Sequence, residues 1–161
     1  MEKIRQLVEE AFDGTLSSDD WEHMLGGWHV VILERKALPS HTRPSSPALE
    51  AAGRLFRTGY GEGVATAPGR RCEGLGSSVV SQVASLLRSK FELGALSTGR
   101  HAFYERLGWQ RWRGPTFVRH ADDLVRTEED DDSVTVLRFG PSLALDLARP
   151  ISCEARTGDH W

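Results

Sequence analysis

The sequence has few of the features that would place a chain outside the ordinary globular class. Cys72 and Cys153 are its two cysteines, and neither has neighbours at metal-ligand spacing, so we expect neither a disulfide framework nor a metal site. No apolar run approaches the roughly 20 residues that cross a bilayer, and residues 1–12 lack the apolar stretch of a signal peptide. We therefore expect a cytoplasmic protein with reduced thiols.

Internal repeats, low-complexity tracts and a strong net charge are also missing. The 161 residues fit one domain with a proper core, and a net charge of −3 argues against a nucleic-acid partner, which would normally meet a basic face. Acidic residues gather at Asp19 and Asp20, at residues 128–132, and at Asp159 beside the carboxylate of Trp161. Such clusters are typical of solvated loops, but several that converge would attract a polycation.

Hydrophobic periodicity predicts a mixed α/β chain. Apolar residues at helical spacing predict helices over residues 2–12, 77–90 and 101–107, and a short helix that begins near Ser17 and ends at Gly26. Residues 28–35 favour a strand, which we expect to be central because both of its faces are apolar. Prolines predict that residues 37–47 form an edge strand, a distorted strand or a loop. Further strands are predicted over residues 55–57 leading into 61–66, and over 91–97, 133–139 and 151–156, with a broken strand over 109–119.

Residues 70–76 (RRCEGLG) lie between the strand that ends at Thr66 and the helix over 77–90. Gly74 and Gly76 allow a sharp bend that brings N–H groups close to a ligand, and Arg70 and Arg71 add positive charge near the helix N-terminus. A diphosphate suits this combination, although glycines between a strand and a helix often only make a turn. Strand, turn, helix and strand in this order predict a βαβ crossover.

These residues resemble the acetyl-coenzyme A motif of the GCN5-related N-acetyltransferase (GNAT) superfamily. The strand EGVAT at 62–66 precedes a turn that meets the pattern R/Q-x-x-G-x-G/A through Arg71, Gly74 and Gly76. Tyr104, followed by Gly108 and Trp109, also suits this superfamily. The resemblance implies the GNAT fold, an α/β (α+β) domain with a twisted, mixed and mostly antiparallel sheet flanked by helices.

Further blocks, spread in order over nearly the whole chain, resemble the aminoglycoside 2′-N-acetyltransferases. They are DWEH at 20–23 with LGG at 25–27, GY at 59–60 ahead of EGVA at 62–65, LGALS at 93–97, GPT at 114–116 and GDHW at 158–161. The resemblance implies direct transfer of acetyl from acetyl-CoA to the 2′-amino group of an aminoglycoside antibiotic in a ternary complex, with resistance as the result. It also implies a homodimer.

The same resemblance implies roles for individual residues. Glu62 is expected to be either the base that takes the amine proton, acting through a water, or an anchor that holds the cation. Tyr104 is expected to protonate the leaving thiolate, with a core aromatic as the other interpretation. The expected acetyl-CoA contacts are Val64, whose N–H would meet the thioester oxygen, Ala65, Thr66, Arg71, Cys72, Glu73, Gly74, Leu75, Gly76 and Ser77. The expected substrate contacts are Asp20, Glu62, Gly63, Ser97, Asp130, Asp131, Asp159 and Trp161, with the member of residues 130–132 that faces the pocket left open.

The sequence departs from the family pattern at several points. It begins directly at the first helix, so the amino-terminal strand of similar proteins is expected to be missing. Cys72 replaces a usual glycine of the turn, and Thr15 stands where relatives often have an acid. Fewer acids favour a less cationic substrate such as kasugamycin. Alternatives are an acyltransferase for a polyamine, a peptide amino terminus or a protein lysine, and a non-catalytic binding protein that keeps the cofactor turn.

Overall fold

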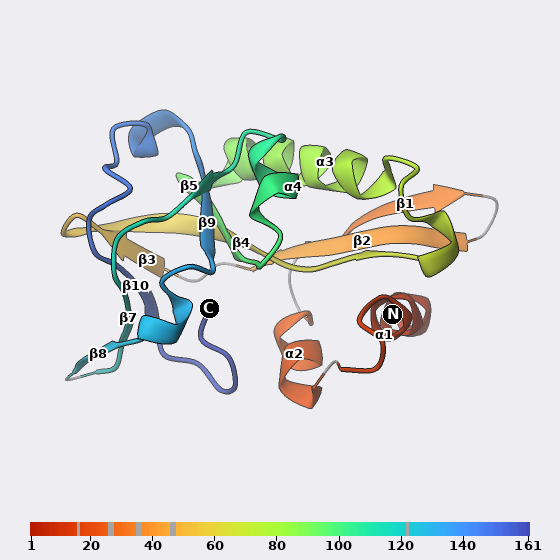
Figure 1. Ribbon diagram of the computed structural model, residues 1–161, viewed down its shortest axis with the longest axis horizontal. Helices are drawn as coiled ribbons and strands as arrows, with labels where there is room; N and C mark the ends of the chain where they lie inside the picture. Colours follow the sequence, from red (N-terminus) through yellow and green to blue (C-terminus); the bar gives the residue numbers. More distant parts are fainter. Residues whose placement is uncertain (16, 26–27, 35–36, 46–47, 122) are drawn as a thin grey trace.

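A computed structural model describes residues 1–15, 17–25, 28–34, 37–45, 48–121 and 123–161, with the backbone alone for residues 33–45. Its described strands form one sheet, and helices cover both faces (Figure 1). Helices α3 (Leu75–Lys90) and α4 (His101–Glu105) lie on one face. Helices α1 (Glu2–Ala11) and α2 (Ser18–His23) lie on the other. The expected fold class is confirmed.

The four helices form where the periodicity predicts them. Ile4, Leu7 and Val8 form the buried face of α1, and Ser17 and Asp20 close a reciprocal capping box at the start of α2. The predicted end of α2 at Gly26 lies outside the described residues. Helix α4 is followed by Gly108 at φ +86°, a backbone conformation that suits glycine.

The order of the sheet is β6-β9-β5-β4-β3-β10-β7-β8, with β2 also paired to β4 and β1 paired to β2. Most neighbours are antiparallel. The strands are β1 (Val30–Glu34), β2 (Ala37–Ser45), β3 (Ala48–Ala51), β4 (Arg54–Thr66), β5 (Leu93–Ser97), β6 (Gln110–Arg111), β7 (Thr116–Arg119), β8 (Leu124–Arg126), β9 (Val134–Arg138) and β10 (Ile151–Glu154). Parallel pairing of β4 with β5 across α3 confirms the predicted crossover.

The prediction that residues 28–35 form a central strand is wrong. Among the described residues, β1 pairs only with β2, so it lies at an edge of the sheet. Its apolar character has another cause, because Val30 packs into the core beneath α3. The apolar faces of a strand show that other parts of the protein cover it. They do not show whether one or both of its edges form hydrogen bonds with a neighbouring strand.

Strand β2 is the distorted strand among the three alternatives for residues 37–47, and not an edge. It pairs with β1 on one side and with β4 on the other, although it contains Pro39 and Pro44. Its register with β4 shifts between His41 and Arg43, which pair with Ala65 and Glu62. Strand β4 thus has one extra residue at this point, the signature of a β-bulge.

Three features were not predicted. Strand β3 turns into β4 through Ala52 and Gly53, both at positive φ, which matches the tight turns of hairpins. Strand β8 pairs with β7, and β7 pairs in parallel with β10. None of these pairings has a distinctive local pattern in the sequence.

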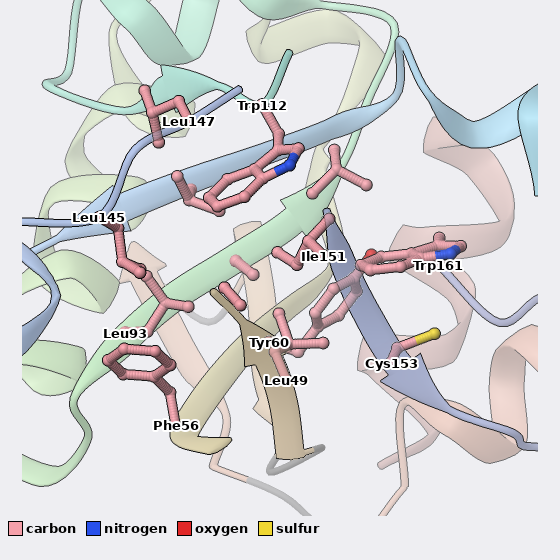
Figure 2. Close-up of a cluster of buried hydrophobic side chains, with 14 of the residues drawn as sticks. Leu49, Phe56, Tyr60, Leu93, Trp112, Leu145, Leu147, Ile151, Cys153 and Trp161 are labelled. Carbon is pink, nitrogen blue, oxygen red and sulfur yellow. The ribbon is translucent and has the colours of Figure 1, made fainter. Parts of the chain in front are cut away.

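The described side chains form three buried clusters. The first lies at the β3, β10 and β7 end of the sheet, where the side chains of Trp112, Tyr60 and Trp161 meet those of several strands (Figure 2). The second joins α3 and α4 to the sheet, and the third joins α1 and Met24 to Ala65 of β4. Strand β4 contributes to the first and third clusters, so its central part lies where they meet.

Candidate active site

A cavity of about 490 Å³ lies at the middle of β4, between the sheet, α2 and the C-terminal segment. Eight of the residues that the sequence assigned to the site line it: Asp20, Glu62, Gly63, Val64, Ser97, Tyr104, Asp159 and Trp161. They come from β4, the end of β5, two helices and the chain terminus. Tertiary structure therefore brings the two predicted catalytic residues and most predicted substrate contacts to one place.

The cavity opens where two parallel strands separate. The register of β4 with β5 runs from Thr58 opposite Leu93 to Tyr60 opposite Ala95 and goes no further. Beyond that point β4 continues beside β2, and β5 continues beside β9. The bulge at Gly63, with φ +61°, bends β4 at the point of separation. Backbone N–H and C=O groups of residues 61–64 consequently lie at the cavity wall.

Gly63 is needed for packing as well as for conformation. A Cβ atom at this position would meet the Met24 sulfur at 2.6 Å. Helix α2 therefore approaches the bulge as closely as a glycine permits, which makes α2 one wall of the cavity.

Glu62 is held by an arginine that the sequence did not single out. The Arg156 guanidinium donates from Nη1 to Glu62 Oε1 at 2.5 Å and from Nε to the Asp159 carbonyl at 2.7 Å. The Glu62 side chain is 10% exposed and that of Arg156 24% exposed. The same guanidinium lies 5.6 Å from the centre of the Tyr60 ring. Arg156 thus ties the C-terminal segment to the bulged strand.

Tyr104 is buried and also lines the cavity. Its ring packs edge-on against Phe103 and Trp109, at centroid distances of 5.0 and 6.0 Å. Burial raises the pKa of Tyr104 to about 12, opposed by the charge of Arg100. The hydroxyl is therefore protonated at neutral pH and can donate a proton or a hydrogen bond. The two interpretations of this residue are compatible, since it is a core aromatic with its edge at a cavity.

The carboxylates at the cavity differ in what else they do. Asp20 Oδ2 accepts hydrogen bonds from the backbone N–H and the hydroxyl of Ser17, so this residue also caps α2. Asp159 is exposed, and its carbonyl accepts from Arg156. Trp161, which is 7% exposed, packs into the first core cluster and also lines the cavity beside Asp159.

The three aspartates 130–132 separate in space, and none lines this cavity. Asp131 pairs with Arg126 and accepts from the Thr116 N–H at 2.9 Å, so it joins the loop to β7. Asp132 pairs with Arg111 on another face. Asp130 lies within electrostatic range of Asp159 and Tyr60, and burial, foremost, and Glu129 raise its pKa. Asp131 therefore has a structural role, and the structure places none of the three aspartates at the cavity wall.

The turn before α3 has the geometry expected of an anion cradle. Gly74 is the N-cap of α3 at φ +80°, and the first helical hydrogen bond runs from the Ser78 N–H to its carbonyl. The N–H groups ahead of Ser78 thus precede the helical bonding, and the helix dipole favours an anion there. A Cβ at Gly76 would come within 3.3 Å of Thr66 Oγ1, so the helix start lies directly against the end of β4.

The arginine side chains at this turn bind other groups of the protein. Arg71 donates to the Ala11 carbonyl of α1 at 3.0 Å, and Arg70 pairs with Glu73. Cys72, the replacement for a usual glycine, adopts φ +66°. Residue 72 therefore has a backbone conformation that favours glycine, while the Arg71 side chain points toward α1.

Several lining residues were missed by the sequence analysis, among them Tyr60, His23, Arg100 and Arg156. Tyr60 is 3% exposed, and its hydroxyl makes no hydrogen bond with the described residues. Burial, with a smaller contribution from Glu62, raises the pKa of this hydroxyl, and Arg156 opposes the rise. The one available signal was that Tyr60 precedes Glu62 by two positions, so both side chains project from the same face of β4.

Other kinds of site find little support among the described residues. None of their His, Cys, Asp and Glu side chains group as metal ligands, and no helix in the described ranges is long and apolar enough to cross a membrane. A larger cavity, of about 730 Å³, is lined by Trp112, Arg113 and Asp132. It contains none of the residues that the sequence assigned to the site.

Comparison with known proteins gives a near full-length relative. The aminoglycoside 2′-N-acetyltransferase of Mycolicibacterium fortuitum is 39% identical over 165 residues, which cover 99% of this chain and 84% of the relative. No protein-family model matches the chain.

Solved structures share the fold at low sequence identity. A GNAT-family N-acetyltransferase of Escherichia coli, solved with CoA, has a TM-score of 0.69 at 13% identity and covers 94% of this chain and 83% of its own. A GNAT-family acetyltransferase of Brucella melitensis, solved with acetyl-CoA, has a TM-score of 0.62 at 18% identity, with 89% and 84% covered. A GCN5-related N-acetyltransferase of Kribbella flavida has a TM-score of 0.61 at 19% identity and covers 71% of this chain, which spans only 31% of that protein.

The solved structures therefore confirm the GNAT fold. The near full-length relative adds the family, which the motif blocks of the sequence had led us to expect. This chain belongs to the aminoglycoside 2′-N-acetyltransferase family.

Proposed function

We propose that this protein transfers acetyl from acetyl-CoA directly to the 2′-amino group of an aminoglycoside antibiotic, and so confers resistance. The observation that carries the proposal is the cavity in which Glu62, Tyr104 and Asp159 meet at the separation of β4 and β5. Family membership supplies the class of substrate.

The acetyl-CoA site proposed here extends from Val64 to Ser77. The backbone of residues 64–66 would receive the thioester and pantetheine arm, and the N–H groups at the start of α3 would receive the diphosphate. Gly74 leaves open space at that point, since nothing lies within 4 Å of a Cβ built there. Bound acetyl-CoA would supply the acetyl thioester that the amine attacks.

Glu62 and Tyr104 would move the protons of the reaction. The amine is an ammonium ion in water and must lose a proton before its lone pair can form the N–C bond, and Glu62 would take that proton. The C–S bond breaks as the transfer completes, and the Tyr104 hydroxyl would donate to the leaving sulfur. General acid–base catalysis of this kind contributes about 10²- to 10⁴-fold.

The charge balance of the cavity favours a substrate with few amines. The cavity is lined by the carboxylates of Asp20, Glu62 and Asp159 and by the guanidiniums of Arg100 and Arg156. Thr15, which has no charge, also lines it. Fewer net negative charges attract a polyamine less. We therefore propose kasugamycin as a substrate beside the deoxystreptamine drugs, and a homodimer in the cytoplasm as the working form.

The test is the release of CoA thiol with a panel of aminoglycosides that includes kasugamycin. Turnover with at least one drug, and acetylation at the 2′ nitrogen by NMR, is expected. Glu62→Gln and Tyr104→Phe should lower kcat by about 10²-fold or more while acetyl-CoA binding persists. Acetyl-CoA binding without turnover of any drug would contradict the proposal and favour a binding protein.

A second candidate is an acyltransferase for a polyamine, a peptide amino terminus or a protein lysine. Such substrates need an open groove, whereas Asp159 and Trp161 line the cavity here. Deletion of residues 159–161 separates the two functions. Unchanged turnover of an aminoglycoside by the truncated protein would contradict the drug pocket, and faster turnover of spermidine or a lysine peptide would favour the alternative.

A further inference from the structure

Arg156 joins parts of the site that are distant in sequence. It is 94 residues from Glu62, whose Oε1 accepts a hydrogen bond from its Nη1. Its Nε donates to the Asp159 carbonyl, and its backbone N–H donates to His160 Nδ1 at 3.3 Å. The guanidinium also lies over the Tyr60 ring. One side chain therefore contacts the proposed base, an aromatic cavity wall and the segment that carries Asp159.

These contacts use properties that lysine lacks. A guanidinium is planar and carries donors fixed at different angles, so it can serve a carboxylate and a carbonyl at once while it stacks on a ring. An ammonium is a compact point charge on a flexible stem. Replacement by lysine would therefore keep the charge near Glu62 but lose the fixed direction of the hydrogen bonds.

We infer that Arg156 is a positioning residue of the transfer reaction, which holds the Glu62 carboxylate in one orientation toward the reacting amine. This inference rests on the proposed function. A carboxylate that is 10% exposed has few solvent contacts, so the hydrogen bond from the Arg156 guanidinium fixes its direction. The direction of a base decides whether it reaches the amine.

A purely structural role would have a different signature. If Arg156 only fastened the C-terminal segment, its loss would displace Asp159 and Trp161 and would raise KM for the aminoglycoside. If it positions Glu62, its loss lowers kcat, because the base no longer points at the amine. Added guanidinium distinguishes the two roles further. It can occupy the space beside Glu62 in Arg156→Ala and so restore the position of the base, but it has no covalent link to residue 156 and cannot fasten the C-terminal segment.

The experiment measures steady-state kinetics of Arg156→Ala and Arg156→Lys with the drug that the wild type acetylates best. We expect Arg156→Ala to lose about 10- to 100-fold in kcat, since a small misplacement of a catalytic group can cost 10²-fold. Millimolar guanidinium chloride, far below denaturing concentrations, should restore kcat at least several-fold, whereas equal sodium chloride should not. Arg156→Lys should have an intermediate kcat that guanidinium does not raise.

The matched control is Arg54→Ala. Arg54 also pairs with a glutamate, Glu92, at 3.0 Å, and also lies over a ring, that of Phe56 at 4.6 Å, but it is outside the cavity. It should leave kcat unchanged with and without guanidinium. A rise in Tm on addition of acetyl-CoA checks that each variant folds. If Arg156→Ala does not fold, the kcat of Arg156→Lys tests the inference.

The failure of this inference differs from that of the proposed function. A wild type that acetylates no aminoglycoside contradicts the proposed function by itself. With an active wild type, the inference is overturned by a wild-type kcat in Arg156→Ala or Arg156→Lys, by a change in KM alone, or by a loss of kcat in Arg156→Ala that guanidinium does not restore.

Discussion

Gly158 lies against Asp19, so close that a Cβ atom on Gly158 would come within 2.9 Å of the Cβ of Asp19. The C-terminal segment therefore packs on the first turn of α2, and the two aspartates that follow these residues, Asp20 and Asp159, line one cavity. Figure 1 shows the carboxyl terminus on the face of the sheet that α2 covers. The wall for a cationic substrate is thus built from both ends of the chain.

Replacing Gly158 by valine should disrupt this wall. Its φ of +71° disfavours a β-branched residue, and the new side chain would push the C-terminal segment away from Asp19. Because Asp159 is exposed, its contact with a cationic amine is worth about 1 kcal/mol or less, and we expect KM for the aminoglycoside to rise several-fold, with KM for acetyl-CoA unchanged.

Gly140→Val is the control for backbone strain in this comparison. Gly140 also has a positive φ, +51°, but nothing lies within 4 Å of a Cβ built there. Both variants should lose stability, and only Gly158→Val should change KM for the drug. Equal KM values for the two variants would show that the contact with Asp19 does not shape the pocket.

Tyr104 predicts how stability changes at alkaline pH. Burial raises its pKa to about 12 in the folded protein, whereas an exposed tyrosine titrates near 10. The unfolded chain therefore loses this proton first, so the stability that Tyr104 contributes is complete below pH 10 and is lost as the pH rises toward 12. Urea unfolding from pH 8 to 12 should show a smaller decline in Tyr104→Phe than in the wild type. Equal declines would mean that the hydroxyl is hydrated in the folded protein.

Asp131 should behave as a structural residue and not as a substrate contact. Its hydrogen bonds from Arg126 and Thr116 lower its pKa to about 2, so the stability it contributes is present above pH 4 and is lost as the pH falls toward 2. Asp131→Asn should lower Tm at pH 7 and leave KM for the drug unchanged. Asp130→Asn is the companion variant. An increase in KM for Asp131→Asn alone would reverse this assignment.

Cys72 gives a test of the cofactor turn. Its backbone has φ +66°, which costs a residue with a Cβ about 1 to 2 kcal/mol. Cys72→Gly should raise the free energy of unfolding by about 1 kcal/mol and keep acetyl-CoA binding. Cys72→Ala removes the thiol but keeps the strain, so it should show no gain. A gain in both variants would attribute the effect to the thiol and not to the backbone.

Local chemistry made much of the fold and part of the site predictable. The crossover from β4 through α3 to β5 follows from apolar periodicity and from glycines at the turn, because both act between near neighbours in the chain. The ends of β6 and β7 around Gly114 and Pro115 were predictable for the same reason. Whether a strand lies at the edge or in the centre of the sheet was not predictable, as β1 illustrates. An apolar face can be buried by a helix, and this does not depend on how many strands pair with it.

The sequence alone determined the α/β class and the phosphate-type turn at residues 70–76, since these depend on residue type and short spacing. Its resemblance to a known family singled out Glu62, Tyr104 and Asp159 as residues to consider. Only the tertiary structure decided that β4 and β5 separate after Tyr60 and that Arg156 pairs with Glu62. It alone also decided that the neighbouring Asp131 and Asp132 pair with different arginines, Arg126 and Arg111. Such contacts join residues distant along the chain, and their geometry is set by how the sheet and the C-terminal segment pack together.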